Sequence, residues 1–240
     1  MIKAICSEFV KLRHTAYWMI HTFVPLAGAI LFVIYFMFYR SVGGSDKLKL
    51  TMELTAMVLP LLISVIVGLN VSQEERASRF QNLLAVPNRK MVFLSKLTAH
   101  YLSGMISLTM LFFFFGVGVN FSNNESFPWK LLLLTLPGLA FSSLVLYVLH
   151  LFLNLKFGLG ISLFWGVFEC LQCILYSNIE LHGLWRCVPF SWSVNWINEI
   201  FSGQLSGQCA EWIINGILAG CILSVVLRWF THWEGRKNYE

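Results

Sequence analysis

The residues best suited to chemistry in this sequence are three glutamates in an otherwise apolar chain. Glu74 and Glu75 are adjacent and are followed by Arg76 and Arg79, whereas Glu169 lies inside a long apolar run. A carboxylate near water can act as a general base, and a carboxylate inside a membrane can bind a cationic group or a neighbouring helix. The two locations predict different roles, which depend on the elements that position them.

The Glu74–Glu75 pair suggests hydrolysis as one hypothesis. "EERASR" fits the pattern EExxxR, which resembles the first motif of intramembrane CAAX-type proteases, where a Glu activates water. Those enzymes also need FxxxH, and no histidine here has Phe four residues before it: His21 follows Tyr17 in that register, and His100 follows Lys96. HExxH is absent as well. We therefore expect no catalytic residue and no metal site, and this protease reading stays a minor alternative.

The composition is that of a membrane protein. Hydrophobic residues make up 57% of the chain, charged residues only 12%, and the mean hydropathy is +0.69. Soluble domains carry about 25% charged residues, so a soluble globular domain is excluded. We expect residues 1–240 to form a single transmembrane domain.

A bilayer core requires about 20 mostly apolar residues per helix. Six segments meet or approach this length, namely 16–38, 54–71, 97–121, 131–153, 157–176 and 212–230. The sequence therefore predicts an all-α integral membrane protein with six transmembrane helices and both termini on one side.

The distribution of basic residues predicts which side that is. With the termini inside, the inner segments hold twelve of the 17 Lys and Arg residues: Lys3, Lys11, Arg13, Arg76, Arg79, Arg89, Lys90, Lys96, Lys156, Arg228, Arg236 and Lys237. Inner segments of membrane proteins carry the excess of Lys and Arg. Both termini and the segment around Glu74 are therefore expected in the cytoplasm.

Two further segments have patterns of their own. Residues 1–15 place apolar side chains at helical spacing opposite Lys3 and Lys11, which predicts an amphipathic helix lying in the inner interface. In the outer segment 177–211, Trp192 and Trp196 recur at i and i+4, which predicts a short helix dipping into the membrane. These tryptophans could shape an outer gate or only cap the bundle.

The charged segment 72–90 has helix start and stop signals. Ser72 and Glu75 have the spacing of a capping box, and Pro87 ends the pattern. Its apolar residues form a stripe that would need a partner: Ala77, Phe80, Leu83 and Leu84. The stripe could pack on the membrane and the neighbouring spans, or it could enter a groove of a cytosolic protein.

The segment "EERASRFQNLLAVPNRKMVFLSK" resembles the one after the second span of type-2 ABC exporter permeases. The shared features are the acids Glu74 and Glu75, the "LLAVP" ending, Arg89 and Lys96. "SEFVKLRHTAYWM" is similar to the interfacial elbow helix of the same family, and six spans with a re-entrant segment before the last also correspond. The resemblance implies that residues 72–90 form a coupling helix, with ATPase coupling carried by Glu74, Glu75, Arg76, Arg79, Phe80, Leu83 and Leu84.

In its length of 240 residues and its low content of charged residues, the chain is most similar to permeases of lantibiotic (bacteriocin) immunity transporters. This likeness implies a bacterial cell membrane protein that expels an antimicrobial peptide and gives self-immunity. Export of another amphipathic drug or lipid is the alternative, and a non-transporting membrane receptor is a less favoured one. The long apolar segments and the tryptophans indicate that the protein is surrounded by a lipid bilayer. No feature of the sequence indicates binding to nucleic acid.

The resemblance also implies partner chains. GxxxxGK[ST] is absent, so ATP and Mg are expected on a separate ABC ATPase dimer and no cofactor in this chain. A second permease chain, the same or related, is expected too. Gly216 and Gly220 form a GxxxG that allows close helix approach, either within the subunit or between the two permeases.

Glu169 is the only acid or base deep inside an expected span, so it should face the bundle interior. His21 and Gln172 are its candidate partners, either as a site for a cationic part of the exported peptide or as a helix-packing contact. Among the six cysteines, Cys187 and Cys209 share one polar loop and could form a disulfide there.

Overall fold

The computed structural model describes residues 1–13, 15–39, 41–123, 126–178, 188–203 and 208–236. Within these residues the secondary structure is helical, without a strand, and six helices are long and apolar enough to cross a membrane. They are α2 (Tyr17–Phe38), α3 (Gly44–Ser78), α5 (Arg89–Asn123), α6 (Trp129–Phe157), α7 (Leu159–Asn178) and α9 (Gln208–His232). The predicted all-α membrane fold with six spans is confirmed.

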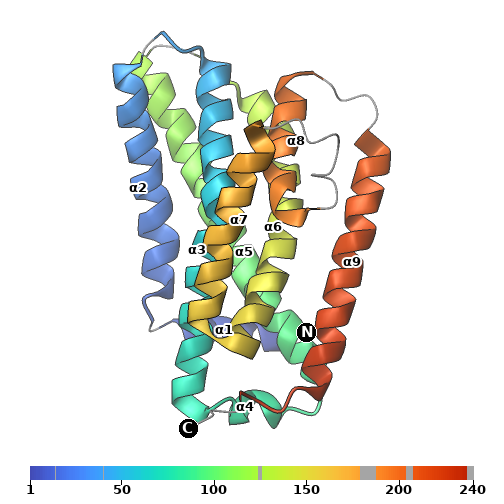
Figure 1. Ribbon diagram of the computed structural model, residues 1–240. Helices are drawn as coiled ribbons and strands as arrows, with labels where there is room; N and C mark the ends of the chain where they lie inside the picture. The colour runs from blue at the N-terminus through green and yellow to red at the C-terminus, as the bar shows by residue number, and fades with distance from the viewer. Residues whose placement is uncertain (14, 40, 124–125, 179–187, 204–207, 237–240) are drawn as a thin grey trace.

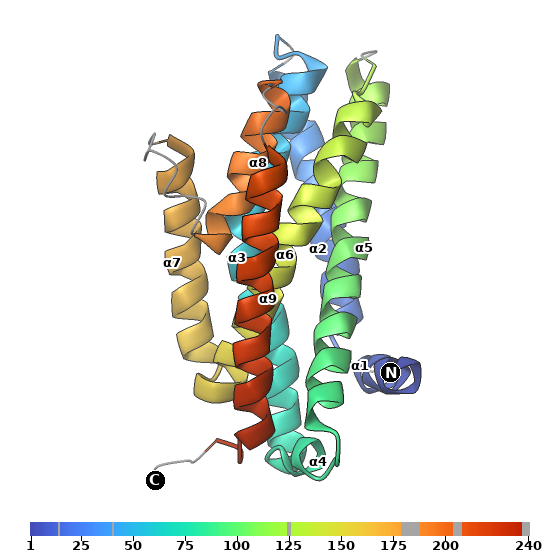
Figure 2. The same cartoon turned by 90° about the vertical axis from the view of Figure 1, so that its right-hand side faces the viewer.

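The six long helices run side by side along one axis (Figure 1). Helix α1 (Ile2–Leu12) lies across one end of the bundle and is seen end-on in Figure 2. The short helix α4 (Gln81–Leu84) and the end of α9 lie at this same end, which we call the base. A 3-10 turn, η2 (Pro189–Ser191), and helix α8 (Trp192–Phe201) pack toward the opposite end.

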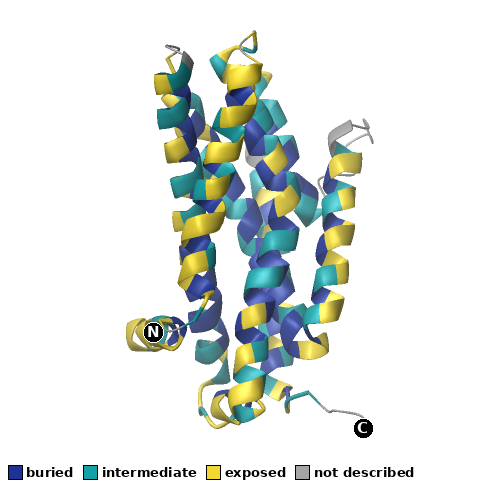
Figure 3. Ribbon diagram, turned by 90° about the vertical axis from the view of Figure 1, so that its left-hand side faces the viewer, coloured by how far each residue is buried: buried dark blue, intermediate teal, exposed yellow. Residues whose placement is uncertain are grey.

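Helix α3 is the centre of the bundle and packs against α6, α7 and α8. Its buried face alternates small and large side chains, from Met52 and Ala56 to Ile63 and Val67. Buried residues follow the bundle interior, whereas exposed ones cover its outer faces (Figure 3). Many outward side chains are large and apolar, as expected where lipid is the solvent.

A proline interrupts the hydrogen bonding of α2. Pro25 has no N–H, so the carbonyl of His21, four residues earlier, loses its helical donor. The Ser107 hydroxyl of α5 donates to that carbonyl oxygen at 2.8 Å. A polar group freed inside an apolar bundle is thereby satisfied by the neighbouring helix.

The structure differs from the predicted helix 72–90. Helix α3 runs through Ser72 without a break, so the Ser72–Glu75 capping box does not begin a helix. The residues before Ser72 are already helical and buried against the bundle, and this packing overrides the local start signal. The helix ends instead at Arg79 and Phe80, both with left-handed φ values of 46° and 66°, before the four residues of α4.

The outer segment 177–211 is described only in part. The expected short helix is present as α8, and Trp192, Val194 and Ile197 are buried against the bundle. The possible disulfide between Cys187 and Cys209 falls outside the described side chains.

Candidate functional site

A buried set of opposite charges joins α1, α3 and α5 at the base. The Lys96 ammonium of α5, with its side chain 3% exposed, lies 2.8 Å from a Glu8 carboxylate oxygen and 2.9 Å from one of Glu74. Lys11 adds a second ammonium, 2.6 Å from Glu8 and 3.4 Å from Glu74. Two carboxylates and two ammonium groups therefore alternate, which balances the charge of the buried Lys96 and Glu8, whereas Lys11 is 46% exposed.

The charged set continues inward through neutral side chains. Lys96 Nζ also donates to Asn70 Oδ1 at 3.2 Å, and the same oxygen lies 3.1 Å from His100 Nε2. Because the amide oxygen only accepts, Nε2 carries the His100 proton, and Nδ1 accepts from the Tyr17 hydroxyl at 3.2 Å. Sequence reasoning missed this extension. Its only signal was that His100 stands one turn after Lys96 on the same helix face.

Charge pairing sets the protonation of the α1 groups. Burial by itself would raise the pKa of the Glu8 carboxyl, but Lys96 and Lys11 outweigh it and hold that pKa below its usual value. Burial would likewise lower the pKa of the Lys11 ammonium, and Glu8 with Glu74 raises it instead. The attachment of α1 is therefore ionic at neutral pH.

This attachment should weaken in acid. A lowered folded-state pKa of Glu8 contributes stability that is present above the ordinary carboxyl pKa of about 4.3 and is lost as the pH falls through the folded value. We expect the midpoint temperature of thermal unfolding of the detergent-solubilised protein to decrease as the pH is lowered below about 4.5. The decrease should be less steep in Glu8→Gln. Equal pH slopes for the two proteins, measured by thermal unfolding, would contradict this assignment.

A second ion pair fastens the end of the chain to α3. The Arg236 guanidinium, beyond α9, binds both carboxylate oxygens of Glu75 at 2.8 and 2.7 Å and donates to the Asn154 carbonyl of α6 at 2.8 Å. Arg89, at the start of α5, donates to the Trp233 carbonyl at 2.7 Å. The α3–α4–α5 connector is thus held between α1 on one side and the end of α9 on the other.

The predicted apolar docking stripe is largely occupied within the chain. Phe80 is 2% exposed, packs against Trp233 with ring centroids 5.1 Å apart, and has the Arg236 guanidinium 5.4 Å above its ring. Leu83 is buried, and Leu84 is half-buried. Of the two alternatives for this stripe, packing within the chain is the one observed for Phe80, because Trp233, directly after α9, supplies an aromatic surface beside it.

The exposed part of the connector carries mostly polar side chains and no large apolar one. Arg76 and Arg79 are exposed at the end of α3, and Gln81, Asn82 and Ala85 are exposed on and after α4. Glu74 and Glu75, by contrast, point into the two ion-pair sets just described. Of the seven residues assigned to coupling, only the two arginines present their side chains outward.

Glu169 meets a different partner from those expected. Its Oε2 lies 2.8 Å from His150 Nε2 of α6, and both side chains are fully buried. His21 is on α2 and packs on Tyr17 and α5, while Gln172 is half-buried one turn further along α7. The predicted His21 contact is wrong because α7 packs on α3 and α6, which places α2 outside its reach, and the hydrogen bond observed for Glu169 goes to His150 instead of Gln172.

The Glu169 pair belongs to a polar cluster between α3, α6 and α7. His150 Nδ1 lies 3.0 Å from the Ser162 hydroxyl, which also accepts from Asn154 Nδ2 at 2.8 Å. Glu169 Oε1, Asn154 Oδ1 and the Ser64 hydroxyl have no hydrogen-bond partner among the described residues. Polar groups of this kind inside a membrane-spanning bundle are uncommon and costly, which distinguishes this cluster from the apolar packing around it.

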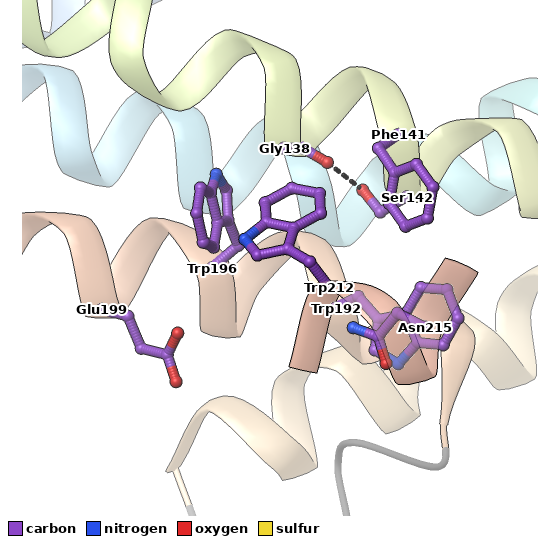
Figure 4. A pocket seen from close by; sticks show the side chains of 8 residues that line it. All are labelled: Gly138, Phe141, Ser142, Trp192, Trp196, Glu199, Trp212 and Asn215. Carbon is purple, nitrogen blue, oxygen red and sulfur yellow. Dashed lines mark hydrogen bonds between the residues drawn. The ribbon is translucent and has the colours of Figure 1, made fainter. Parts of the chain in front are cut away.

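The two predicted gate tryptophans lie in a hollow between α6, α8 and α9 (Figure 4). Trp196 stands edge-on to Trp212 with centroids 4.3 Å apart, and Trp192 is stacked with Phe141. Trp196 fits only because residue 138 is glycine: a Cβ there would overlap its indole nitrogen. The indole N–H of Trp196 and the amide oxygen of Asn215 have no partner in the described part of the chain, so the hollow offers a donor and an acceptor among aromatic rings.

These contacts bear on the hydrolytic alternative. Glu74 is bonded to Lys96 and Glu75 to Arg236, so neither carboxylate is placed as a base for a water. No group of three His, Cys, Asp or Glu side chains that could hold a metal occurs among the described residues. The EExxxR match therefore reflects two structural ion pairs.

The architecture defines a multi-pass helical membrane protein whose charged residues join its helices at one end. Residues 4–169 match the family model described as ABC-2 family transporter protein, and the chain belongs to this family. The matched region begins in α1 and ends at Glu169 in α7, so it contains the whole base network around Lys96. No curated protein and no solved structure matches the chain.

Membership of this family defines the general function of the chain. The chain is the membrane permease of an ABC exporter, a transport subunit rather than a catalytic one. A permease of this family works with an ABC ATPase partner.

Proposed function

We propose that this permease expels a lantibiotic or similar antimicrobial peptide from a bacterial cell membrane and thereby gives self-immunity. In this proposal the base faces the cytoplasm with both termini, and a separate ATPase dimer binds ATP and Mg and docks there. The positive-inside distribution of Lys and Arg supports this orientation. The exposed Arg76 and Arg79 at the base are consistent with an acidic docking surface on the partner.

The observation that carries the proposal is the doubly fastened connector. Glu74 ties its α3 end to Lys96 and α1, and Glu75 ties it to Arg236 beyond α9. A displacement of α4 would therefore act on α3 and on the segment after α9 together, because ion pairs and the buried Phe80 ring join the connector to both. Rigid joints of this kind are what a transporter needs to pass a motion from an ATPase to its spans.

The route inward would follow the same contacts. Arg236 holds both Glu75 and the Asn154 carbonyl, and the Asn154 amide bonds Ser162 beside the His150–Glu169 pair. Movement of the connector would thus reach the buried acid through side chains in direct contact. In this proposal Glu169 binds the cationic part of the peptide when the α6–α7 contact opens.

Charge reversal of the exposed tip tests the docking role. We expect Arg76→Glu combined with Arg79→Glu to insert normally but to lose at least about tenfold in co-purification with the ATPase subunit, because two attractive charges become repulsive. Binding is measured by pull-down from co-expressing cells, with membrane abundance recorded in parallel.

Lys3→Glu is the matched control, since Lys3 is equally exposed but lies on α1. It should leave co-purification unchanged. Normal ATPase binding by the double variant would refute docking at this tip.

The proposed substrate is tested by measuring the resistance of cells to a lantibiotic. Cells carrying the permease with its ATPase should survive a lantibiotic better than cells carrying an ATPase-dead pair. Equal protection against cationic peptides and uncharged amphipathic drugs would favour the broader alternative, export of another drug or lipid. Protection that does not depend on ATP hydrolysis would favour a non-transporting receptor.

A second permease chain completes the proposal. A Cβ at Gly216 or Gly220 of α9 would meet no other atom of this chain within 4 Å, so the GxxxG is not used within the described subunit. Of the two uses expected for this motif, packing inside the subunit is therefore not observed among the described residues. Close approach of another permease, identical or related, is one use that remains.

A further inference from the structure

A hollow inside the membrane-spanning part of the bundle is separate from the Glu169 cluster and from the tryptophan hollow. It lies between α2, α3 and α5 and is partly open, with an enclosed volume of about 60 Å³ and with Leu59, Ile63, Leu108 and Leu111 among its walls. One water needs about 10–15 Å³ of such volume, so the enclosed part admits only the head of a ligand, and the rest of the ligand must lie in the open part of the hollow. The walls are almost entirely apolar, so a charged occupant is excluded by the cost of desolvation.

One polar atom of the lining lacks a partner. His21 is 5% exposed, and its Nε2 has no hydrogen bond among the described residues. The other ring nitrogen, Nδ1, lies 2.9 Å from the Tyr17 carbonyl oxygen. A carbonyl only accepts, so Nδ1 carries the proton, and no acid is among the ring's bonding partners to hold it doubly protonated. In the neutral ring Nε2 is therefore a bare acceptor.

The hydroxyl groups beside His21 do not satisfy this acceptor. Ser107 donates its proton to the His21 carbonyl, which Pro25 leaves free, and Thr55 donates to the Thr51 carbonyl at 2.7 Å. The third hydroxyl of the lining, that of Tyr147, makes no hydrogen bond to His21 Nε2 either, so a buried acceptor stays without a donor in apolar surroundings. A buried acceptor without a donor costs about 1–3 kcal/mol, which an occupant that brings a donor would recover.

The geometry points to a binding site for an uncharged amphiphile, an apolar chain that ends in a hydroxyl or amide N–H donated to His21 Nε2. Its entrance lies on the lipid-facing side of α2, where Val24 lines the hollow and is 42% exposed. The ligand would arrive from the bilayer, as a neutral lipid or as another membrane-dissolved amphiphile. This site does not depend on the identity of the exported peptide.

The test compares two photoreactive probes that differ only at the head. A diazirine-bearing long-chain alcohol can donate to His21, whereas its methyl ether of the same chain length cannot. Each is irradiated with the purified permease in nanodiscs, with unlabelled alcohol as competitor, and modified peptides are mapped by mass spectrometry. We expect saturable labelling of the α2, α3 and α5 lining, about fivefold stronger for the alcohol, the value of one hydrogen bond.

Substitutions separate the head contact from the chain contact. His21→Phe should remove the preference for the alcohol while leaving labelling by the ether. Val24→Trp should block the entrance and reduce both probes at least about tenfold. The matched control is Phe23→Trp, at the adjacent, lipid-facing position outside the hollow.

Three results would overturn the site. Equal labelling by the two probes in the unaltered protein would mean that water satisfies His21. Labelling that does not saturate, or that spreads evenly over the lipid-facing helices, would mean that no site exists. Unchanged labelling in Val24→Trp would mean that ligands do not enter beside Val24. If that variant unfolds earlier than Phe23→Trp, the alcohol–ether comparison in the unaltered protein and in His21→Phe decides alone.

To separate the two sources, the lipid extract of the purified protein is analysed by mass spectrometry. A stoichiometric neutral lipid would identify a bilayer component. An empty extract with retained alcohol labelling would leave a transported or added amphiphile as the occupant.

Discussion

Lys96→Met should be the most damaging single substitution at the base. The Lys96 ammonium is the common partner of Glu8 and Glu74, and only 3% of its side chain is exposed. Methionine keeps the shape of the stem but leaves two nearby carboxylates with Lys11 alone. Removing one partner of a buried ion pair costs about 3–5 kcal/mol, and we expect a loss of that size in the free energy of unfolding.

The measurement is denaturant unfolding of the permease in detergent micelles, with Lys90→Met as the matched control. Lys90 is an exposed residue of the same helix, and its replacement should change the free energy by less than about 0.5 kcal/mol. Adding Glu8→Gln and Glu74→Gln to Lys96→Met should recover much of the loss, because the uncompensated charges are then gone. A triple variant no more stable than the single one would show that Lys96 acts through packing instead.

The second large effect is expected at the intramembrane pair. His150→Leu removes the group that lies 2.8 Å from Glu169 and leaves a fully buried carboxyl without its observed partner. We expect membrane abundance to fall several-fold, since the bare acid must either stay charged in a low dielectric or take up a proton without a bonding partner. Abundance is measured by quantitative immunoblotting of isolated membranes.

Two further variants tell folding from transport. Combining His150→Leu with Glu169→Leu removes both polar groups and should restore abundance, as for other buried pairs replaced by apolar residues. Glu169→Gln keeps a hydrogen-bonding group for His150, so it should preserve abundance yet lower protection against the exported peptide. Equal loss of abundance and protection in Glu169→Gln would reassign Glu169 to helix packing.

Local pattern predicted the spans well because each span is determined by its own residues. Any helix in a bilayer must satisfy its backbone internally and be apolar over about 20 residues, so length and hydropathy reveal it without knowledge of its neighbours. The helix that contains Trp192 and Trp196 was also predicted from its own residues, in this case from the i, i+4 spacing of the two tryptophans. The observed helices are longer than predicted at the base, where charged turns of α3 and α5 continue beyond the apolar runs.

The capping box at Ser72 shows where local reasoning stopped. Ser72 and Glu75 would start a helix in a free segment, but here the chain enters them from a helix already packed in the bundle. The cost of two ordinary residues inside a helix is a few tenths of a kcal/mol each, less than the packing that holds α3 straight. A tertiary contact therefore outweighed a correct local preference.

The sequence alone determined that this chain is a six-span membrane protein and that Glu169 is buried. It also showed that the segment after the second span is charged and carries an apolar stripe that needs a packing partner. Only the tertiary structure decided the partners: Lys96 for Glu74, Arg236 for Glu75, His150 for Glu169, and Trp233 for Phe80. The physical reason is that hydropathy is a property of each residue and its neighbours along the chain. Pairing of charges and rings depends instead on how helices far apart in sequence rotate and pack, and no local pattern encodes that rotation.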